Sequence, residues 1–197
     1  MTEFWNERFG DKEYAYGIKP NEFYKNQIQK IPPGKVLFPA EGEGRNAVYA
    51  AKSGWQVTAF DPSIVGKRKA ENLAAKNGVE IEYLIDNYES VILPQASFDC
   101  VVLIFAHMHP IKRNEYHQKL ISFLKPGGAL ILEGFSKKQI NNDTGGPRNI
   151  DMLFSKEELL SDFNNLSNLK IEEKDVFLNE GIYHHGVAST IRIIGMK

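Results

Sequence analysis

Two carboxylates stand among the glycines of a short turn, in the stretch VLFPAEGEGRN at 36–46. Glycines let a backbone approach a ligand closely, and the open N–H groups at the start of the next helix face that ligand. Gly42, Gly44 and Ala47 fit the G-x-G-x-x-A fingerprint of dinucleotide-binding turns. Asp61 ends the next strand-like run at the spacing expected for an acid that accepts hydrogen bonds from ribose hydroxyls.

The charge of this turn disfavours a pyrophosphate. Glu41 and Glu43 crowd a place where a phosphate needs positive or neutral surroundings, so they favour a cationic ligand. In LIDN, Asp86 and Asn87 end the third strand-like run, at the same carboxyl edge of the expected sheet. An Asp side chain there accepts from an exocyclic adenine amine, while a backbone N–H donates to the ring.

Composition limits the classes of protein and partner. The 197 residues are 42% hydrophobic and 25% charged, which suits one compact α/β domain. Lys and Arg number 24 against 25 Asp and Glu, so no global field draws the chain onto nucleic acid or anionic lipid, and a small partner is expected. The only cysteine, Cys100, lies in an apolar run and is expected to be a core thiol. Without a secretion-signal pattern or a long apolar run, we expect a cytoplasmic protein.

Short apolar runs alternate with helical stretches, which predicts βαβ units and a parallel sheet. The expected strands are 36–40, 56–60, 80–85, 100–105 and 129–135, and the expected helices are about 45–53, 63–77 and 112–124. After Phe135 comes a polar, glycine-rich loop that is either a substrate lid or a mobile connector. Ser155 and Glu158 form a capping-box start of another helix, and the runs 170–180 and 186–196 predict a final hairpin that adds an antiparallel strand.

The order of the glycine turn, Asp61 and Asp86 resembles that of the class I S-adenosylmethionine-dependent methyltransferases. FDCVVLIFAHMHP resembles the family's fourth-strand motif, and FLKPGGALILEGF its helix-turn-fifth-strand motif. The N-terminal FWNERFGDKEYAYGIKPNEF resembles the cap of the tellurite-resistance and thiopurine methyltransferase branch, whose W-x-x-R-F and Y-x-Y-G-x-x-P-N segments fold over the cofactor. These matches cover most of the chain to about residue 135.

The resemblance implies a Rossmann-like α/β fold: a seven-stranded, mostly parallel sheet with helices on both faces and a C-terminal antiparallel hairpin. We expect one domain over 1–197, with a cap segment at 1–30, a cofactor-binding core at 31–135, and the loop, helix and hairpin at 136–197. The implied cofactor is S-adenosyl-L-methionine. The residues expected to bind it are Trp5, Tyr16, Gly17, Ala40, Glu41, Gly42, Gly44, Asp61, Pro62, Asp86, Asn87 and Phe105. Their alternative roles are structural: turn packing, helix capping and core packing.

The turn departs from the family pattern at two positions. Phe38 replaces the usual acid, and Ala40 replaces the first glycine. We expect cofactor binding to survive at Ala40 if its φ stays negative. Glu41 is the candidate to supply the acceptor that the methionine amino group loses with the missing acid.

Histidines are the candidates for a general base or a substrate contact. His107 and His109 follow the fourth strand, and His184 lies in the final hairpin. A metal site formed with His185 has no supporting carboxylate or cysteine spacing, and solvated or capping histidines are the structural alternative. A base is needed only for a poorly acidic hydroxyl or a protonated amine, whereas a thiolate or chalcogen oxyanion needs none.

The function predicted is methyl transfer to a small-molecule acceptor whose attacking atom, S, Se, Te, O or N, stays open. Arg8 and Arg148 are candidates to pair with an anionic acceptor. No NPPY-like segment follows the fourth strand, which argues against DNA amine methylation. An NAD(P)-dependent oxidoreductase shares the fingerprint but leaves Asp86 unexplained and lacks a Tyr-x-x-x-Lys pair. A non-catalytic S-adenosylmethionine-binding module is the second alternative.

Overall fold

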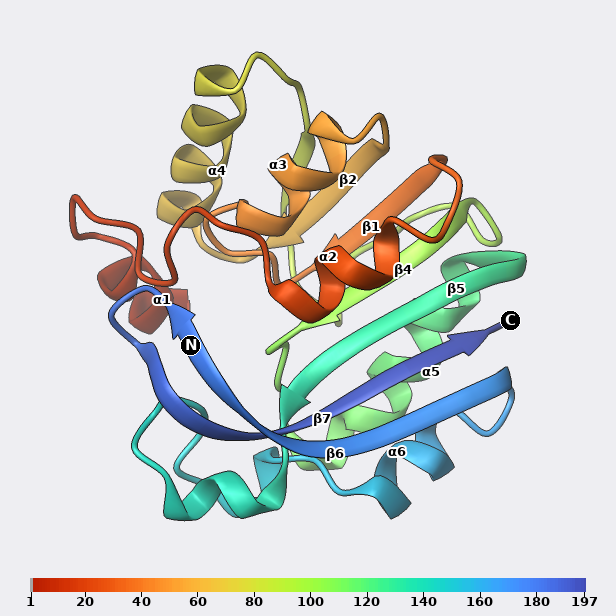
Figure 1. Cartoon of the computed structure of the whole chain (residues 1–197). Coiled ribbons are helices and arrows are strands. Elements are labelled where there is room, and N and C mark those ends of the chain that lie inside the picture. The colour runs from red at the N-terminus through yellow and green to blue at the C-terminus, as the bar shows by residue number, and fades with distance from the viewer. Residues whose placement is uncertain (1) are drawn as a thin grey trace.

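The computed structural model describes residues 2–197 and consists of one mixed sheet flanked by helices (Figure 1). The sheet has seven strands in the order β3-β2-β1-β4-β5-β7-β6. Their bounds are β1 Lys35–Pro39, β2 Gln56–Asp61, β3 Glu82–Ile85, β4 Phe98–Ile104, β5 Leu124–Phe135, β6 Ser167–Glu180 and β7 His184–Met196. The Rossmann-like class predicted from the sequence is confirmed.

The first five strands, β1 to β5, are parallel, and β7 and β6 complete the sheet beyond β5. β1 pairs parallel with both β2 and β4, and β4 pairs parallel with β5. β7 lies antiparallel between β5 and β6, as the predicted hairpin requires. Because the chain order reverses between β1 and β4, the crevice at their carboxyl ends is the place where ligands bind in sheets of this type.

Helices cover both faces of the sheet, as Figure 1 shows. They are α1 Thr2–Arg8, α2 Glu22–Ile28, α3 Arg45–Lys52, α4 Ile64–Lys76, α5 Arg113–Phe123 and α6 Lys156–Asp162, with 3₁₀ turns η1 Pro110–Lys112, η2 Lys137–Asn141 and η3 Ile150–Met152. Successive side chains of β1 point to opposite faces of the sheet, so the hydrophobic core has two parts. Val36 and Phe38 pack with residues of α2 and α3, such as Tyr24 and Ala47. Leu37 packs on the other face, with residues of α5 and α6. Cys100 is fully buried, so the prediction of a core thiol is confirmed.

The N-terminal segment is bonded to the middle of α4 by Lys69. Lys69 Nζ donates to the carbonyl oxygens of Phe9, Asp11 and Glu13 at 3.1, 2.8 and 2.6 Å. The Tyr14 hydroxyl donates back to the Lys69 carbonyl at 3.1 Å. These bonds hold α1 at the carboxyl edge of the sheet, close to the turn between β6 and β7 (Figure 1).

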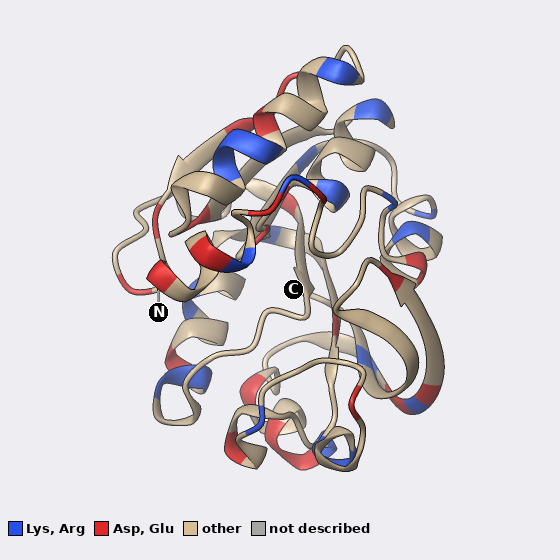
Figure 2. Ribbon diagram, turned by 90° about the vertical axis from the view of Figure 1, so that its left-hand side faces the viewer, with Lys and Arg blue, Asp and Glu red and all other residues tan. Residues whose placement is uncertain are grey.

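Charges of both signs are interspersed over the elements visible in Figure 2, in keeping with the net charge of −1. Within residues 2–197, no helix combines the length and apolar character needed to cross a membrane.

Candidate functional site

The glycine turn between β1 and α3 takes a left-handed backbone twice. Gly42 has a φ of 63° and Gly44 a φ of 86°. A Cβ on Gly44 would lie 2.5 Å from Ala70 Cβ, so this glycine lets α3 approach α4. A Cβ on Gly42 would lie 3.0 Å from the Phe9 ring, which places the N-terminal segment directly on the turn. The two glycines are therefore required for the packing of the turn against α4 and the N-terminal segment, in addition to any contact with a ligand.

Two non-glycine residues at the same edge are also left-handed. Ala40 follows β1 with a φ of 51°, and Phe105 follows β4 with a φ of 52°. The condition set from the sequence, a negative φ at Ala40, is therefore not met. A left-handed aromatic residue is a rare backbone state, and such states gather at functional sites. Here they mark the ends of the two neighbouring strands that frame the crevice.

Ala40→Gly is expected to stabilise the protein by about 1 kcal/mol, because glycine adopts a positive φ without the steric cost that alanine bears. The measurement is urea unfolding of the wild-type and variant proteins. Ala59→Gly, in the buried interior of β2, is the matched control and is expected to destabilise. A loss of stability in Ala40→Gly would contradict the left-handed conformation.

Asp61 is buried at the end of β2 and holds the turn to the start of α4. Its Oδ2 accepts from the Gly42 N–H at 3.2 Å, and its Oδ1 accepts from the Ser63 N–H at 2.8 Å. Pro62 joins Asp61 to Ser63, the N-cap of α4. Burial raises the pKa of Asp61 to about 6, against these two hydrogen bonds. Each carboxylate oxygen has one such backbone donor, which leaves each a further lone pair for a ligand.

The two glutamates of the turn have protein partners. Glu41 Oε1 accepts from the backbone N–H groups of Asn46 and Ala47 at 2.8 and 2.7 Å, so it caps the start of α3. Burial raises the pKa of Glu41 to about 7. Glu43 is buried and lies 2.6 Å from Lys69 Nζ, which offsets its charge. The negative charge expected from the sequence at this turn is therefore partly neutralised.

Asp86 and Asn87 build a tight turn after β3. Asp86 Oδ1 accepts from the Asn87 N–H at 2.8 Å and from the Ser90 hydroxyl. Asn87 Oδ1 accepts from the N–H groups of Glu89 and Ser90. The Asp86 N–H donates to the Asp61 carbonyl at 3.3 Å, so the two acids predicted from the sequence lie on adjacent strand ends.

Aromatic rings connect the N-terminal segment with the end of β4. Trp5 stacks on Phe9 at 5.4 Å between ring centroids, and the Phe9 ring lies 6.5 Å from Tyr16. His184 lies 4.5 Å from Tyr16 and 4.6 Å from Phe105. Gly17, with a φ of 69°, follows Tyr16 and passes close to Gly181 in the turn between β6 and β7. The structure thus brings together Trp5, Tyr16 and Phe105, which are far apart in the sequence.

His107 is bonded to backbone at both ring nitrogens. Its Nδ1 donates to the Met152 carbonyl at 2.8 Å, and its Nε2 accepts from the Phe135 N–H at 3.0 Å. Burial lowers its pKa to about 4. Neither nitrogen is left to accept a proton, so the structure does not favour the predicted base role for His107. His109 is exposed and begins η1, without a side-chain capping bond.

His184 is buried beside an acid that the sequence analysis did not identify. Its Nδ1 lies 3.5 Å from Glu180 Oε2, the oxygen that also accepts from Arg45 at 2.8 Å. Burial lowers the pKa of His184, although Glu180 opposes this. Burial also opposes ionisation of Glu180, but Arg45 and His184 outweigh it and lower the Glu180 pKa to about 2. The imidazole of His184 thus lies beside a carboxylate that Arg45 keeps ionised.

The same acid belongs to a buried network that ties the cap to the sheet. The Asn21 amide donates to Glu133 Oε2 at 2.6 Å and to Glu180 Oε1 at 3.1 Å. Arg192 Nε donates to Glu133 Oε1 at 2.6 Å. Two of these residues carried a signal in the sequence: Glu133 is a single acid inside an apolar strand, and Arg45 directly follows the glycine turn. No sequence pattern indicated that Asn21 would contact Glu133 or Glu180.

The loop that follows η2 lies against this cluster. A Cβ on Gly145 would lie 3.0 Å from His184 Nε2, and one on Gly146 would lie 2.8 Å from the Phe135 ring. The Thr144 hydroxyl donates to the Val187 carbonyl at 2.7 Å, which fixes the loop to β7. Arg148 pairs with Asp143 at 2.8 Å and is exposed, while Arg8 stacks over the Tyr183 ring at 3.8 Å. The lid role of this loop stays a prediction.

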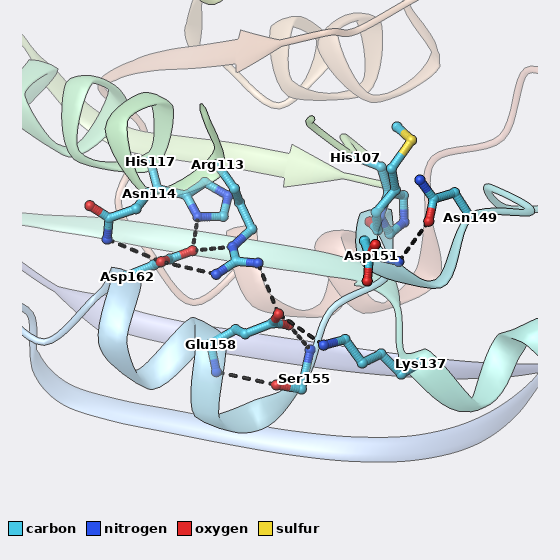
Figure 3. Close-up of polar contacts among 11 residues, drawn as sticks. His107, Arg113, Asn114, His117, Lys137, Asn149, Asp151, Ser155, Glu158 and Asp162 are labelled. Carbon is cyan, nitrogen blue, oxygen red and sulfur yellow. Dashed lines mark hydrogen bonds and ion pairs between the residues drawn. The ribbon is translucent and has the colours of Figure 1, made fainter. Parts of the chain in front are cut away.

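A second polar cluster, shown in Figure 3, joins α5 to α6 around Asp162. Arg113 Nε and His117 Nδ1 donate to Asp162 Oδ2 at 2.6 and 2.8 Å, and the Asn114 amide donates to Oδ1 at 3.0 Å. Arg113 also pairs with Glu158, which forms the predicted capping box with Ser155. Because every donor comes from α5, this cluster fixes one helix to the other.

Residues 2–197 contain no group of three or more His, Cys, Asp or Glu side chains placed to hold a metal ion.

Comparisons with known proteins find methyltransferases among the proteins that this chain resembles. Residues 36–128 match the family model described as a methyltransferase domain. The chain is 33% identical over 73 residues to the ubiquinone/menaquinone biosynthesis C-methyltransferase UbiE of Pasteurella multocida, covering 37% of this chain and 26% of that protein. It is 27% identical over 141 residues to a ubiquinone biosynthesis O-methyltransferase of Xanthomonas axonopodis, covering 70% and 58%. The chain therefore spans less than two thirds of either relative.

Solved structures share the fold at low identity. TehB from Haemophilus influenzae superimposes with a TM-score of 0.74 at 15% identity, over 100% of this chain and 66% of that one. A structure that concerns the conversion of a disulfide bond into a thioacetal group during echinomycin biosynthesis gives a TM-score of 0.79 at 16% identity, over 100% of this chain and 92% of that one. A SAM-dependent methyltransferase from Methanosarcina mazei gives 0.66 at 18%, over 91% and 98%. At identities of 15 to 18%, these neighbours show that the chain shares their fold.

Proposed function

We propose that this protein transfers the methyl group of S-adenosylmethionine to a small-molecule acceptor at the carboxyl edge of β1, β2 and β4. The observation that carries the proposal is Asp61, a buried carboxylate with spare acceptor capacity at the crevice where the strand order reverses. The match over residues 36–128 supports the same assignment.

The residues present fit the cofactor. A nucleoside with two ribose hydroxyls needs a carboxylate acceptor, which Asp61 supplies, and Asp86 stands on the adjacent strand end for the adenine amine. The buried Tyr88 hydroxyl has no hydrogen-bond partner within residues 2–197, which is the kind of atom that a bound ligand satisfies. The negative charge of Asp61 also favours a ligand that carries a cationic sulfonium.

When bound, the cofactor supplies an activated methyl group on sulfur. The chain's own contribution is alignment and exclusion of water. Trp5, Phe9 and Tyr16 of the cap, together with Phe105, form the apolar side of the crevice. Lys69 keeps the cap in place through the three carbonyl groups that it binds.

His184 is the base that we assign to acceptors that must lose a proton. Its side chain is buried, its Nδ1 lies near a carboxylate, and its ring lies between those of Tyr16 and Phe105. Glu180 Oε2 lies 3.5 Å from Nδ1 and favours the tautomer that carries its proton there, so that Nε2 would accept the proton of the acceptor. Arg45 joins this pair to the helix that follows the glycine turn.

His184→Gln is expected to slow methylation of a catechol roughly 100-fold, because the hydroxyl loses its base. Methylation of thiophenol, which is largely ionised near about pH 8, is expected to change less than about threefold. Initial rates with S-adenosylmethionine measure both, and His185→Gln serves as the exposed control. Equal losses with the two acceptors would show that His184 has no base role.

The function itself is tested by calorimetric titration with S-adenosylhomocysteine, NAD and NADP in separate experiments. We expect binding of S-adenosylhomocysteine alone. Binding of a nicotinamide nucleotide alone would support the oxidoreductase alternative and overturn the proposal. Binding without turnover across thiol, selenol, hydroxyl, amine and tellurite acceptors would instead identify a non-catalytic binding module.

A further inference from the structure

We propose that the Tyr88 hydroxyl is a further cofactor contact, donating a hydrogen bond to an oxygen of the bound nucleoside or of its amino acid. This inference rests on the proposed function, since it requires that an adenosyl ligand occupies the crevice. Neither the glycine turn nor the acids predicted from the sequence include this residue.

Tyr88 is held inward by the turn that follows β3. Asn87 Oδ1 accepts from the N–H groups of Glu89 and Ser90, and the Val91 N–H donates to the Asn87 carbonyl at 3.0 Å. From α5, Lys119 Nζ donates to the carbonyl oxygens of Tyr88 and Glu89 at 3.0 and 2.7 Å. The backbone of Tyr88 is therefore fixed from two sides.

The ring packs among apolar and aromatic neighbours. It stacks on Tyr116 of α5 at 5.5 Å and an interplanar angle of 23°. It meets Phe60 of β2 edge-on at 5.9 Å. Tyr88 packs against the same hydrophobic cluster as Ala40 and Leu84. Phenylalanine would fill this place as well as tyrosine does, so packing alone gives no reason for a hydroxyl.

The hydroxyl is buried without a hydrogen-bond partner among residues 2–197. An unpaired buried polar group destabilises a protein, and a group of this kind requires a reason. Its position supplies one. Phe60 directly precedes Asp61 in β2, and Asp61 lies near enough that its charge, after burial, adds to the rise in the pKa of Tyr88. The Tyr88 ring therefore lies beside the carboxyl ends of β2 and β3, where the proposed cofactor would bind.

Tyr88→Phe distinguishes a ligand contact from a structural role of the hydroxyl. A hydroxyl that contacts only the ligand predicts a higher melting temperature of the ligand-free variant, whereas a hydroxyl with a structural partner predicts a lower one. Without ligand, removal of an unpaired buried hydroxyl is expected to raise the melting temperature by roughly 2 °C. With ligand, the variant is expected to bind S-adenosylhomocysteine about tenfold more weakly, since it loses one hydrogen bond. Tyr116→Phe is the matched control, with the stacked ring on α5 kept, and is expected to leave the affinity unchanged.

Adenosine as a second titrant assigns the contact. An equal loss with adenosine places the partner on the nucleoside, and a loss confined to S-adenosylhomocysteine places it on the amino acid. Unchanged affinity of Tyr88→Phe overturns the inference and leaves the proposed function intact. A lower melting temperature with unchanged affinity would show that the hydroxyl has a structural partner. If S-adenosylhomocysteine fails to bind the wild-type protein, the proposed function itself fails.

Discussion

Asp61→Ala is expected to weaken S-adenosylhomocysteine binding by about 1 to 3 kcal/mol, roughly tenfold to a hundredfold. The variant loses the acceptor for the ribose hydroxyls. It also frees the N–H groups of Gly42 and Ser63, which Asp61 now binds at 3.2 and 2.8 Å. Calorimetry measures the change.

Two controls separate binding from folding for Asp61. Asp61→Asn keeps one carbonyl oxygen as an acceptor and is expected to lose less affinity than the alanine variant. Far-ultraviolet circular dichroism and the melting temperature establish that the variants remain folded. An alanine variant that binds with wild-type affinity would remove Asp61 from the site, and with it the main support for the proposed function.

Asp162→Ala is expected to lower the free energy of unfolding by about 3 to 5 kcal/mol, because it leaves Arg113 and His117 without their shared acceptor in the interior. For a chain of this size, that corresponds to a fall of roughly 10 °C in the melting temperature. Urea unfolding measures the free energy. Asp151→Ala is the matched control, since Asp151 is exposed, and is expected to change little.

The effect of Asp162 has a defined dependence on pH. Burial would raise the pKa of Asp162, but hydrogen bonds from His117, Arg113 and Asn114 outweigh it and hold the pKa well below its usual range. A depressed carboxyl pKa contributes stability above the unfolded-state value of about 3.9, and this stability is lost as the pH falls through the folded value. The gap between wild type and Asp162→Ala is therefore expected to shrink below about pH 4. A gap of constant size would show that the effect is packing rather than charge.

The order of strands and helices could be predicted from the sequence because each element carries a local pattern. The apolar run at 100–105 overlaps β4, which spans Phe98–Ile104, and the glycine turn directly precedes α3. Ser155 and Glu158 predicted the start of α6, because the two residues of a capping box lie only three positions apart in the sequence. Asp61 and Asp86 could be placed at one edge because parallel strands end together.

The partners of those residues were decided by contacts between distant segments. Asn21 meets Glu133 and Glu180 across 112 and 159 positions, and no local pattern encodes such a contact. The two turn glutamates looked alike in the sequence, yet only Glu43 reaches a lysine, while Glu41 caps α3.

The sequence by itself therefore determined the βαβ order, the turn and the acids at the strand ends, because periodicity and turn chemistry act over a few residues. Only the tertiary structure decided the left-handed backbone of Ala40, the bonding of both His107 ring nitrogens to backbone and the pairing of His184 with Glu180. The physical reason is that hydrogen-bond partners and desolvation arise from packing between segments far apart in the chain.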